Sequence, residues 1–310
     1  MKYLVTGGAG FIGSHLVEHL VGGGHSVTVL DDFSSGKREN IEPWLAKITL
    51  IEGSITDPAV CARAIAGADY VLHEAAVPSV PRSVADPVTS HAVNATGTLN
   101  VLIAARDANV KRVVFAASSS AYGDTVELPK HEGIVPRPRS PYAAAKLIGE
   151  SYCRAFHASY GLPAISLRYF NVFGPRQDPQ SQYAAVVPKF IAAALAGTAP
   201  TIYGDGGQTR DFTYVQNVVR ANLAACTAPE AALGEVFNIG CGERLSVLDL
   251  WRRIAKLTGA TVPPRHEPER AGDVRDSLAS LDRAKSLLKW APTIGLDEGL
   301  ALTLAATRRG

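Results

Sequence analysis

The sequence predicts an α/β fold: a doubly wound parallel sheet with helices on both faces and a smaller second lobe. Short apolar runs rich in β-branched residues recur as YLVT, SVTVL, ITLI, YVLH, RVVFAA and AISLRYF. Between them lie longer amphipathic stretches, which we expect to be helices over residues 11–21, 87–108 and 140–160. This alternation predicts βαβ units, because parallel strands need a crossover that is long enough to hold a helix.

Length and a change in composition predict the second lobe. The chain has 310 residues, more than one hydrophobic core usually covers. Beyond residue 170, loops rich in Gly, Pro and Arg become frequent, as in "GPRQDPQSQY" and "YGDGGQTRDFTYV", and such loops often line ligand sites. We predict a nucleotide-binding domain over 1–170 and a smaller substrate-binding domain over 171–310. Part of 211–240 is expected to return to the first domain, because "EVFNIG" has a strand pattern.

Composition favours a globular cytoplasmic protein. The net charge of +2, from 31 basic and 29 acidic residues, does not favour nucleic acid or an anionic membrane as partner. The four cysteines lack the spacing of metal ligands, so we expect reduced thiols and no metal site. Glycines soon interrupt the N-terminal apolar run, unlike in a signal peptide, and no other apolar run reaches membrane-spanning length.

A glycine-rich turn follows the first predicted strand. In "TGGAGFIGSH", Gly7, Gly10 and Gly13 recur at three-residue spacing, which allows a tight turn and close approach of the backbone to a pyrophosphate. Asp31 ends the second predicted strand, where a carboxylate binds the adenosine ribose hydroxyls and repels a 2′-phosphate. We therefore predict a Rossmann-type site for tightly bound NAD rather than NADP. The alternative is a structural turn in which Asp31 only caps a helix.

A second group of residues points to proton transfer. In "SPYAAAKLIGE", Tyr142 and Lys146 stand four positions apart in a predicted helix and therefore share one face. A tyrosine with the usual pKa of about 10 is a weak base at neutral pH, so it needs a nearby positive charge, which Lys146 would supply. Ser118 ends the fifth predicted strand, at the sheet edge where α/β proteins bind ligands. Alone, the tyrosine could equally be a core residue and the lysine a solvated one.

Together these motifs resemble those of the extended short-chain dehydrogenase/reductases. The resemblance rests on T-G-x-x-G-x-x-G, the serine run before Tyr-Gly and Y-x-x-x-K. Within that family, "SPYAAAK", "LRYFNVFGPRQ" and "GDGGQTRDFTYV" resemble the nucleotide-sugar 4-epimerases typified by UDP-galactose 4-epimerase. The resemblance covers nearly the whole chain and implies an isomerase that inverts C4 of a UDP-sugar.

The resemblance also implies a role for individual residues. Tyr142 would be the catalytic base and acid, Lys146 its charged partner, and Ser118 a hydroxyl that shares the proton. The expected cofactor contacts are Gly7, Gly10, Phe11, Ile12, Gly13, Asp31, Asp32, Ser35, Gly36, Ser54, Ile55, Ala75, Ala76, Asn94, Tyr142, Lys146 and Tyr169. The expected substrate contacts are Ser79, Ser118, Ser119, Tyr142, Asn171, Ala185, Val186, Tyr203, Arg210, Arg270, Asp273 and Ser277.

Departures from the pattern leave other functions open. Gly-Ser-Ile at 53–55 replaces a common Gly-Asp-Ile, and Pro78 stands where some members carry a lysine, as in those that act on modified UDP-hexoses. A 4,6-dehydratase or decarboxylase is one rival, but such enzymes usually have an acid in the segment where this chain has only serines and Ala121. A non-catalytic NAD-binding regulator is a rival of another class, although regulators usually lose the tyrosine or lysine.

Two further expectations concern assembly and substrate width. The helices over 87–108 and 140–160 carry extra apolar residues (Leu99, Leu102, Leu147 and Tyr152), and in the family such helices form a dimer contact, so we expect a homodimer. Ser277 occupies a position where members restricted to plain hexoses tend to have tyrosine. We therefore expect room for an acetamido group, unless Ser277 starts a strand and faces away.

Overall fold

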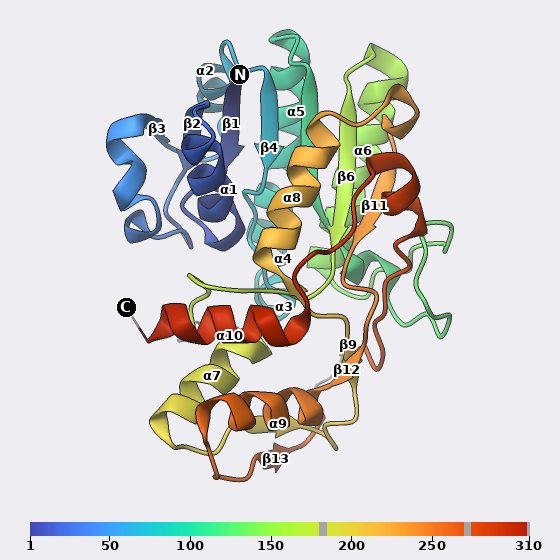
Figure 1. The fold of residues 1–310 in the computed structure, drawn as a ribbon. Coiled ribbons are helices and arrows are strands. Elements are labelled where there is room, and N and C mark those ends of the chain that lie inside the picture. Colours follow the sequence, from blue (N-terminus) through green and yellow to red (C-terminus); the bar gives the residue numbers. More distant parts are fainter. Residues whose placement is uncertain (180–184, 270–273, 309–310) are drawn as a thin grey trace.

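A seven-stranded parallel sheet forms the larger part of the molecule (Figure 1). The computed structural model describes residues 1–179, 185–269 and 274–308. The strand order is β11-β6-β5-β4-β1-β2-β3, as expected for a doubly wound sheet. The strands are β1 (Lys2–Thr6), β2 (Ser26–Asp31), β3 (Ile48–Glu52), β4 (Tyr70–His73), β5 (Arg112–Ser118), β6 (Ala164–Tyr169) and β11 (Val236–Ile239). The predicted fold class is therefore confirmed, and the returning strand over 235–240 is β11, paired with β6.

Helices cover both faces of this sheet, so that its strands are buried on both sides. One face carries α1 (Phe11–Gly22) and α8 (Val215–Cys226), which pack on each other. The other carries α2 (Pro58–Ile65), α5 (Thr98–Asp107) and α6 (Pro141–Tyr160). The bounds of α6 follow from its sequence: Ser140 accepts a hydrogen bond from the Ala143 N–H as N-cap, and left-handed Gly161 ends the helix.

The helix expected over 87–108 is interrupted in the structure. It consists of α4 (Pro87–His91), a π-helical segment η3 (Ala92–Gly97) and α5. Within η3 the buried Asn94 side chain bonds to both backbone groups of Val77, and Gly97 lies so close to Ile55 that a Cβ there would approach it to 2.7 Å. These tertiary contacts account for the altered winding, which amphipathic periodicity alone does not reveal.

The second lobe is built from short elements around its own apolar cluster, which includes Phe190, Phe212 and Trp251. Its strands are β7 (Val172–Phe173), β8 (Thr201–Tyr203), β9 (Thr209–Arg210), β10 (Thr213–Tyr214), β12 (Leu245–Ser246) and β13 (Arg265–Glu267). Its helices are α7 (Val186–Ala196), α9 (Val247–Thr258) and α10 (Leu296–Thr307). The remaining short helices are α3 (Val80–Ala85), η1 (Arg38–Asn40), η2 (Glu42–Lys47), η4 (Ser119–Tyr122), η5 (Glu230–Ala232) and η6 (Ala284–Leu288). Over the described residues, no helix combines the length and apolarity needed to cross a bilayer.

Candidate active site and cofactor cradle

The glycine-rich turn has the geometry of a phosphate cradle. Gly7 has a φ of 67°, and its N–H donates to the carbonyl of Leu30 at 2.8 Å. A Cβ at Gly13 would lie 2.1 Å from the Gly7 oxygen, so only glycine permits this packing of α1 on the turn. Gly10 precedes α1 and provides no side-chain cap, so the first N–H groups of the helix point toward the turn with their donors available. This arrangement fits a dinucleotide pyrophosphate beside Phe11 and Ile12.

Asp31, the last residue of β2, lies next to the glycine-rich turn. Its carboxylate is 7% exposed and accepts hydrogen bonds from the N–H groups of Ala9 and Phe33, at 2.8 and 2.9 Å. Burial raises the pKa of Asp31, and these two hydrogen bonds oppose the rise. Each carboxylate oxygen keeps acceptor capacity for a ribose hydroxyl. Gly36 lies against Asp31, where a Cβ would come within 2.9 Å of Oδ1, while Asp32 and Ser35 are exposed beside it.

Ser118, Tyr142 and Lys146 meet at the carboxyl end of β5. The Lys146 side chain is buried, its Nζ donates to the carbonyl of Ala116 at 2.7 Å, and it lies 5.0 Å above the ring of Phe115. Burial raises the pKa of Tyr142, whereas hydrogen bonding with Ser118 lowers it. Burial lowers the pKa of Lys146 to about 8, and carboxylates nearby oppose this shift. Only the pKa of Lys146 is thus moved toward neutral pH; Tyr142 needs a nearby positive charge to ionise.

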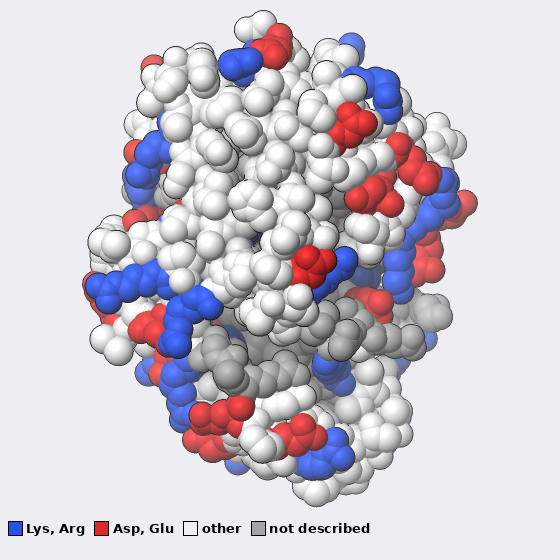
Figure 2. Space-filling view, turned by 180° about the vertical axis from the view of Figure 1, so that it is seen from behind, with Lys and Arg blue, Asp and Glu red and all other residues white. Residues whose placement is uncertain are grey.

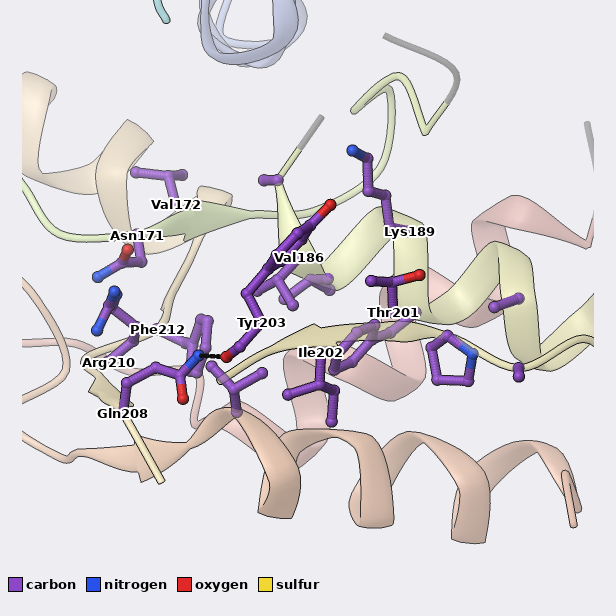
Figure 3. Close-up of a pocket in the computed structure, with 17 residues that line it drawn as sticks. Asn171, Val172, Val186, Lys189, Thr201, Ile202, Tyr203, Gln208, Arg210 and Phe212 are labelled. Atoms are coloured by element: carbon purple, nitrogen blue, oxygen red, sulfur yellow. Dashed lines mark hydrogen bonds between the residues drawn. The ribbon is translucent and has the colours of Figure 1, made fainter. Parts of the chain in front are cut away.

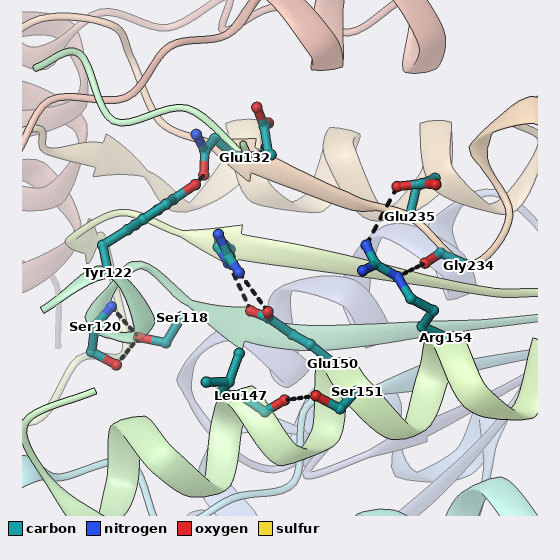
Figure 4. A network of polar contacts seen from close by, with 12 residues as sticks. Ser118, Ser120, Tyr122, Glu132, Leu147, Glu150, Ser151, Arg154, Gly234 and Glu235 are labelled. Carbon is teal, nitrogen blue, oxygen red and sulfur yellow. Dashed lines mark hydrogen bonds and ion pairs between the residues drawn. The ribbon is translucent and has the colours of Figure 1, made fainter. Parts of the chain in front are cut away.

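Polar contacts hold α6 against the sheet and so fix the positions of Tyr142 and Lys146 relative to Ser118. Glu150 accepts two hydrogen bonds from the Arg168 guanidinium of β6, at 2.8 and 2.7 Å, and both side chains are buried (Figure 4). At the start of the helix, the Tyr142 N–H donates to the Ser83 hydroxyl at 3.1 Å. Ser118 in turn accepts hydrogen bonds from the backbone and the side chain of Ser120, as Figure 4 shows. The catalytic group is thus supported from three separate segments.

Two cavities adjoin this site. The first, which we call the reaction cavity, has a volume of about 470 Å³. Its lining includes Ser118, Ser119, Ser120, Lys130, Tyr142, Tyr169, Asn171, Arg210 and Ser277. The second, the lobe cavity, measures about 490 Å³ and lies between α7 and β8 (Figure 3). Its lining includes Asn171, Ala185, Val186, Tyr203, Gln208, Arg210 and Phe212. Because Asn171 and Arg210 line both, one extended ligand can reach from one cavity into the other.

The site can now be set beside known proteins. The family model described as "NAD dependent epimerase/dehydratase family" matches residues 3–240. This chain belongs to that family. A protein named UDP-glucose 4-epimerase from Mycolicibacterium smegmatis is 41% identical over 98% of this chain and 97% of its own.

Other similar family members carry different names. The solved structure of a UDP-N-acetylglucosamine 4-epimerase from Methanobrevibacter ruminantium, in complex with UDP-N-acetylmuramic acid, superposes with a TM-score of 0.95. It is 39% identical, and the match covers 99% of this chain and 98% of that one. A UDP-N-acetyl-alpha-D-glucosaminuronate decarboxylase from Bacillus cytotoxicus is 35% identical over 98% of this chain and 97% of its own. Membership of the family thus establishes an NAD-dependent type of enzyme and leaves the substrate to be argued from the site.

Two residues predicted to contact ligands form hydrogen bonds within the protein. The Asn94 amide bonds to the backbone of Val77 and to Ser90 and so holds the loop after β4; its cofactor contact stays a prediction. The Ser79 hydroxyl accepts a hydrogen bond from the Arg82 N–H as N-cap of α3, outside the lining of the reaction cavity. In both cases a short polar side chain satisfies a nearby backbone group. The Ser79 substrate contact likewise stays a prediction.

The remaining predicted residues lie at the sheet edge or outside the described part of the chain. Ala75 packs on the glycine turn, where a Cβ at Gly7 would meet its nitrogen at 2.7 Å, and Ala76 follows it. After β3, the Ser54 hydroxyl accepts a hydrogen bond from the Thr56 hydroxyl, and Ile55 is buried. Ser277 is 7% exposed and lines the reaction cavity. Arg270 and Asp273 lie outside the described residues.

Two functional candidates escaped the sequence analysis. Lys130 is buried in the wall of the reaction cavity, where its Nζ donates to the Gly123 carbonyl at 3.2 Å. Its backbone bridges to Ala279, far along the chain, and no local pattern shows this contact. Glu74 directly follows β4 and accepts a hydrogen bond from Tyr169 at 2.7 Å. A carboxylate at a strand end in "YVLHE" is a signal that could have indicated it. Among the described residues, no cluster of three or more His, Cys, Asp or Glu side chains could hold a metal ion.

Proposed function

We propose that this protein is an NAD-dependent UDP-hexose 4-epimerase that inverts C4 through a transient 4-keto sugar. The observation that carries the proposal is that Ser118 and Tyr142 line the reaction cavity, with Lys146 buried next to them at the end of β5. This cavity shares Asn171 and Arg210 with the lobe cavity. A hexose beside Tyr142 and a uridine diphosphate reaching past Arg210 would use both spaces. Arginine suits the diphosphate, because its planar fork of donors matches phosphate oxygens.

The residues of the chain have distinct parts in the reaction. Tyr142 would take the proton of the sugar 4-hydroxyl, and Ser118 would share the hydrogen bond to that oxygen. Lys146 would keep positive charge beside the phenol, which favours its ionised form. NAD, when bound, would accept the C4 hydrogen with its bonding electrons and return it to the opposite face of the sugar ring. The glycine turn and Asp31 would hold the two ends of its adenosine diphosphate half.

The rival reactions need a group that the reaction cavity lacks. A 4,6-dehydratase requires a general acid or base at C5 and C6 of the sugar. The described lining of the reaction cavity contains hydroxyls, Lys130 and two arginines, Arg139 and Arg210, and it contains no carboxylate. A non-catalytic regulator would have no need for a buried lysine beside a tyrosine, since each buried ionisable group costs stability. The arrangement therefore favours reversible epimerisation.

The test is a product analysis with defined substrates. The purified protein would be incubated with UDP-galactose or UDP-glucose, and the sugars separated by chromatography. We expect each to give the same mixture of both, with no lasting reduction of NAD. A 4-keto-6-deoxy product would show a dehydratase, loss of carbon dioxide from a UDP-uronate would show a decarboxylase, and no turnover of any UDP-sugar would favour a regulator.

Ser277 supports a wider substrate range. It lines the reaction cavity together with Ser118 and Tyr142, and its N–H donates to the Thr209 carbonyl at 3.1 Å. A small side chain there leaves room for an acetamido group, so we propose that UDP-N-acetylglucosamine and UDP-N-acetylgalactosamine are interconverted as well. Replacing it by a bulky residue, Ser277→Tyr, should lower kcat/KM for the acetylated pair selectively. The exposed Ser286→Tyr on η6 is the matched control. Equal losses for both pairs would contradict the proposal.

We also propose a homodimer formed through the face that carries α5 and α6. Figure 2 shows this side of the molecule; the centre of its upper half is a broad area of uncharged residues, with charged side chains around its margin. The structure corrects one expected contact, because Leu102 is fully buried and belongs to the core. Leu99, Leu147 and Tyr152 are partly exposed, and Ile103 is exposed. Sedimentation at micromolar concentration should give twice the chain mass; a monomer alone would contradict the proposal.

A further inference from the structure

Glu74 takes part in a polar contact that crosses the end of the catalytic strand. It follows His73, which is in register with Phe115 of β5, and Tyr169 of β6 is in register with Ser118. Because β5 lies between β4 and β6, the hydrogen bond from the Tyr169 hydroxyl to Glu74 Oε1, at 2.7 Å, spans the strand end that carries Ser118. Glu74 is thus beside the reacting groups although its own strand contributes none of them.

The direction of the hydrogen bonds identifies Glu74 as an acceptor. The Asn222 side-chain amide donates to the Tyr169 oxygen at 2.8 Å and to the Val218 carbonyl at 3.0 Å. Tyr169 has a single proton to give, and it gives this proton to Glu74. The chain of donors therefore ends on a carboxylate. In the described part of the molecule, no Lys, Arg or His comes within 4.0 Å of that carboxylate to form an ion pair.

Strand register places Glu74 level with Lys146. His73 pairs with Phe115, so Glu74 is level with Ala116, whose carbonyl accepts the hydrogen bond from Lys146 Nζ at 2.7 Å. The pKa of Lys146 is lowered to about 8 by burial, and the two carboxylates that oppose the shift are Glu74 first and Glu150 second. Glu150 is already neutralised by its paired hydrogen bonds to Arg168. His73 contributes no charge, because burial lowers its pKa to about 3.

We infer that Glu74 is a positioning residue that keeps Lys146 protonated, and that Tyr169 holds its carboxylate in place for this purpose. The inference assigns to the site a counter-charge that lies on the far side of the strand from the Tyr142 helix. It rests on the proposed use of Lys146 as the charged partner of Tyr142. Glu74 also raises the pKa of Tyr142, so its direct effect on the phenol opposes that of the Lys146 charge.

The arrangement has a defined dependence on pH. Burial raises the pKa of Glu74 to about 7, whereas the hydrogen bond from Tyr169 lowers it. Above about pH 7 the carboxylate is ionised and supports the lysine; below it, the carboxyl is neutral and the support is lost. Removing the Tyr169 donor should raise the pKa of Glu74 and move this transition to higher pH. The other titratable groups that act on the pair are Tyr142, Tyr169, Glu150, His73 and Cys153. Burial raises the pKa of the Cys153 thiol to about 12, so it stays neutral over this range.

The test measures the protonation of Lys146 directly. NMR of isotope-labelled lysine side chains in the NAD-loaded protein would give its pKa, with the signal assigned by its loss in Lys146→Arg. In Glu74→Gln the pKa of Lys146 should fall by about one unit, as expected when one nearby opposite charge is removed. In Tyr169→Phe it should fall between about pH 7 and 8, and return toward the wild-type titration at higher pH. Glu127→Gln, an exposed glutamate, is the control and should change nothing.

Each outcome decides the inference independently of turnover. An unchanged Lys146 pKa in folded Glu74→Gln would overturn the assigned charge. If Glu74→Gln does not fold, an unchanged titration in Tyr169→Phe would do the same. A shift in Glu74→Gln without one in Tyr169→Phe would overturn the holding role of Tyr169. None of these results depends on which sugar is epimerised, so they stand apart from failure of the proposed function.

Discussion

The reaction cavity and the lobe cavity have nearly equal volumes but are built in different ways. The key groups of the first stand at the ends of β5 and β6 and on the 20-residue α6, where ladders, caps and a buried ion pair fix each side chain. The second is lined by α7 and strands of two or three residues, joined by loops. A rigid sheet edge suits chemistry that needs exact distances, whereas short elements suit a pocket whose shape sets ligand choice.

The largest effect is expected from replacing the proposed base, which should impair turnover at the reaction cavity but not UDP binding at the lobe cavity. Tyr142→Phe should lower kcat by about 10²–10⁴-fold, because it removes the group that exchanges the proton. UDP should bind with unchanged Kd, since Tyr142 does not line the lobe cavity. Steady-state kinetics and calorimetry with UDP measure the two quantities. A near wild-type kcat would show that another residue is the base.

A smaller effect is expected from Arg210→Gln, which should weaken UDP binding more than it lowers kcat. Hydrogen bonds to charged groups contribute about 1.5–3 kcal/mol each, so the Kd for UDP should rise by roughly 10- to 100-fold. Because Arg210 Nη1 also donates to the carbonyls of Thr209 and Arg275, the melting temperature must be compared too. Arg252→Gln, on an exposed face of α9, is the control. A loss confined to kcat would place Arg210 in the chemistry instead.

We expect kcat/KM to depend on pH and the Kd for UDP not to. The pKa of Lys146 is lowered to about 8, so the lysine loses its charge as the pH rises through that value, and kcat/KM should fall there. The Kd for UDP should stay flat over the same range. In Lys146→Arg the guanidinium keeps its charge, so the residual activity should lack this alkaline decrease. An alkaline limb that persists in Lys146→Arg would assign it to another group.

The smallest effect tests how tightly the wall behind the lysine is packed. A Cβ at Gly149 of α6 would lie 2.3 Å from the Phe115 ring, over which Lys146 is placed. Gly149→Ala should cost about 1–3 kcal/mol of unfolding free energy through overpacking, with a drop in kcat as Phe115 moves. Gly22→Ala, with no atom near its added Cβ, is the matched control. Denaturation curves of equal midpoint for both variants would contradict this packing.

Predictions from sequence patterns were correct for strands and helices whose formation depends on neighbouring residues in the chain. Six strands of the sheet lie where apolar runs were identified, and α6 fills nearly the whole of the helix predicted over 140–160. The family resemblance named Ser118, Tyr142 and Lys146. The structure places Ser118 and Tyr142 in the lining of the reaction cavity, and Lys146 bonds to the Ala116 carbonyl near the end of β5. The backbone contacts of Asn94 and Ser79 were not foreseen, because whether a polar side chain bonds to a nearby backbone group is decided by tertiary geometry.

The sequence by itself determined the doubly wound sheet, the glycine cradle and the tyrosine–lysine pair, because each depends on spacing within one element or on a motif. Only the tertiary structure decided which distant groups surround that pair. Glu74 and Tyr169 are 95 positions apart, and the backbone of Lys130 bridges to Ala279. Such contacts depend on the order of the strands and on how distant segments pack together. Their energies depend on burial and on neighbouring charges, and both are set by several segments at once.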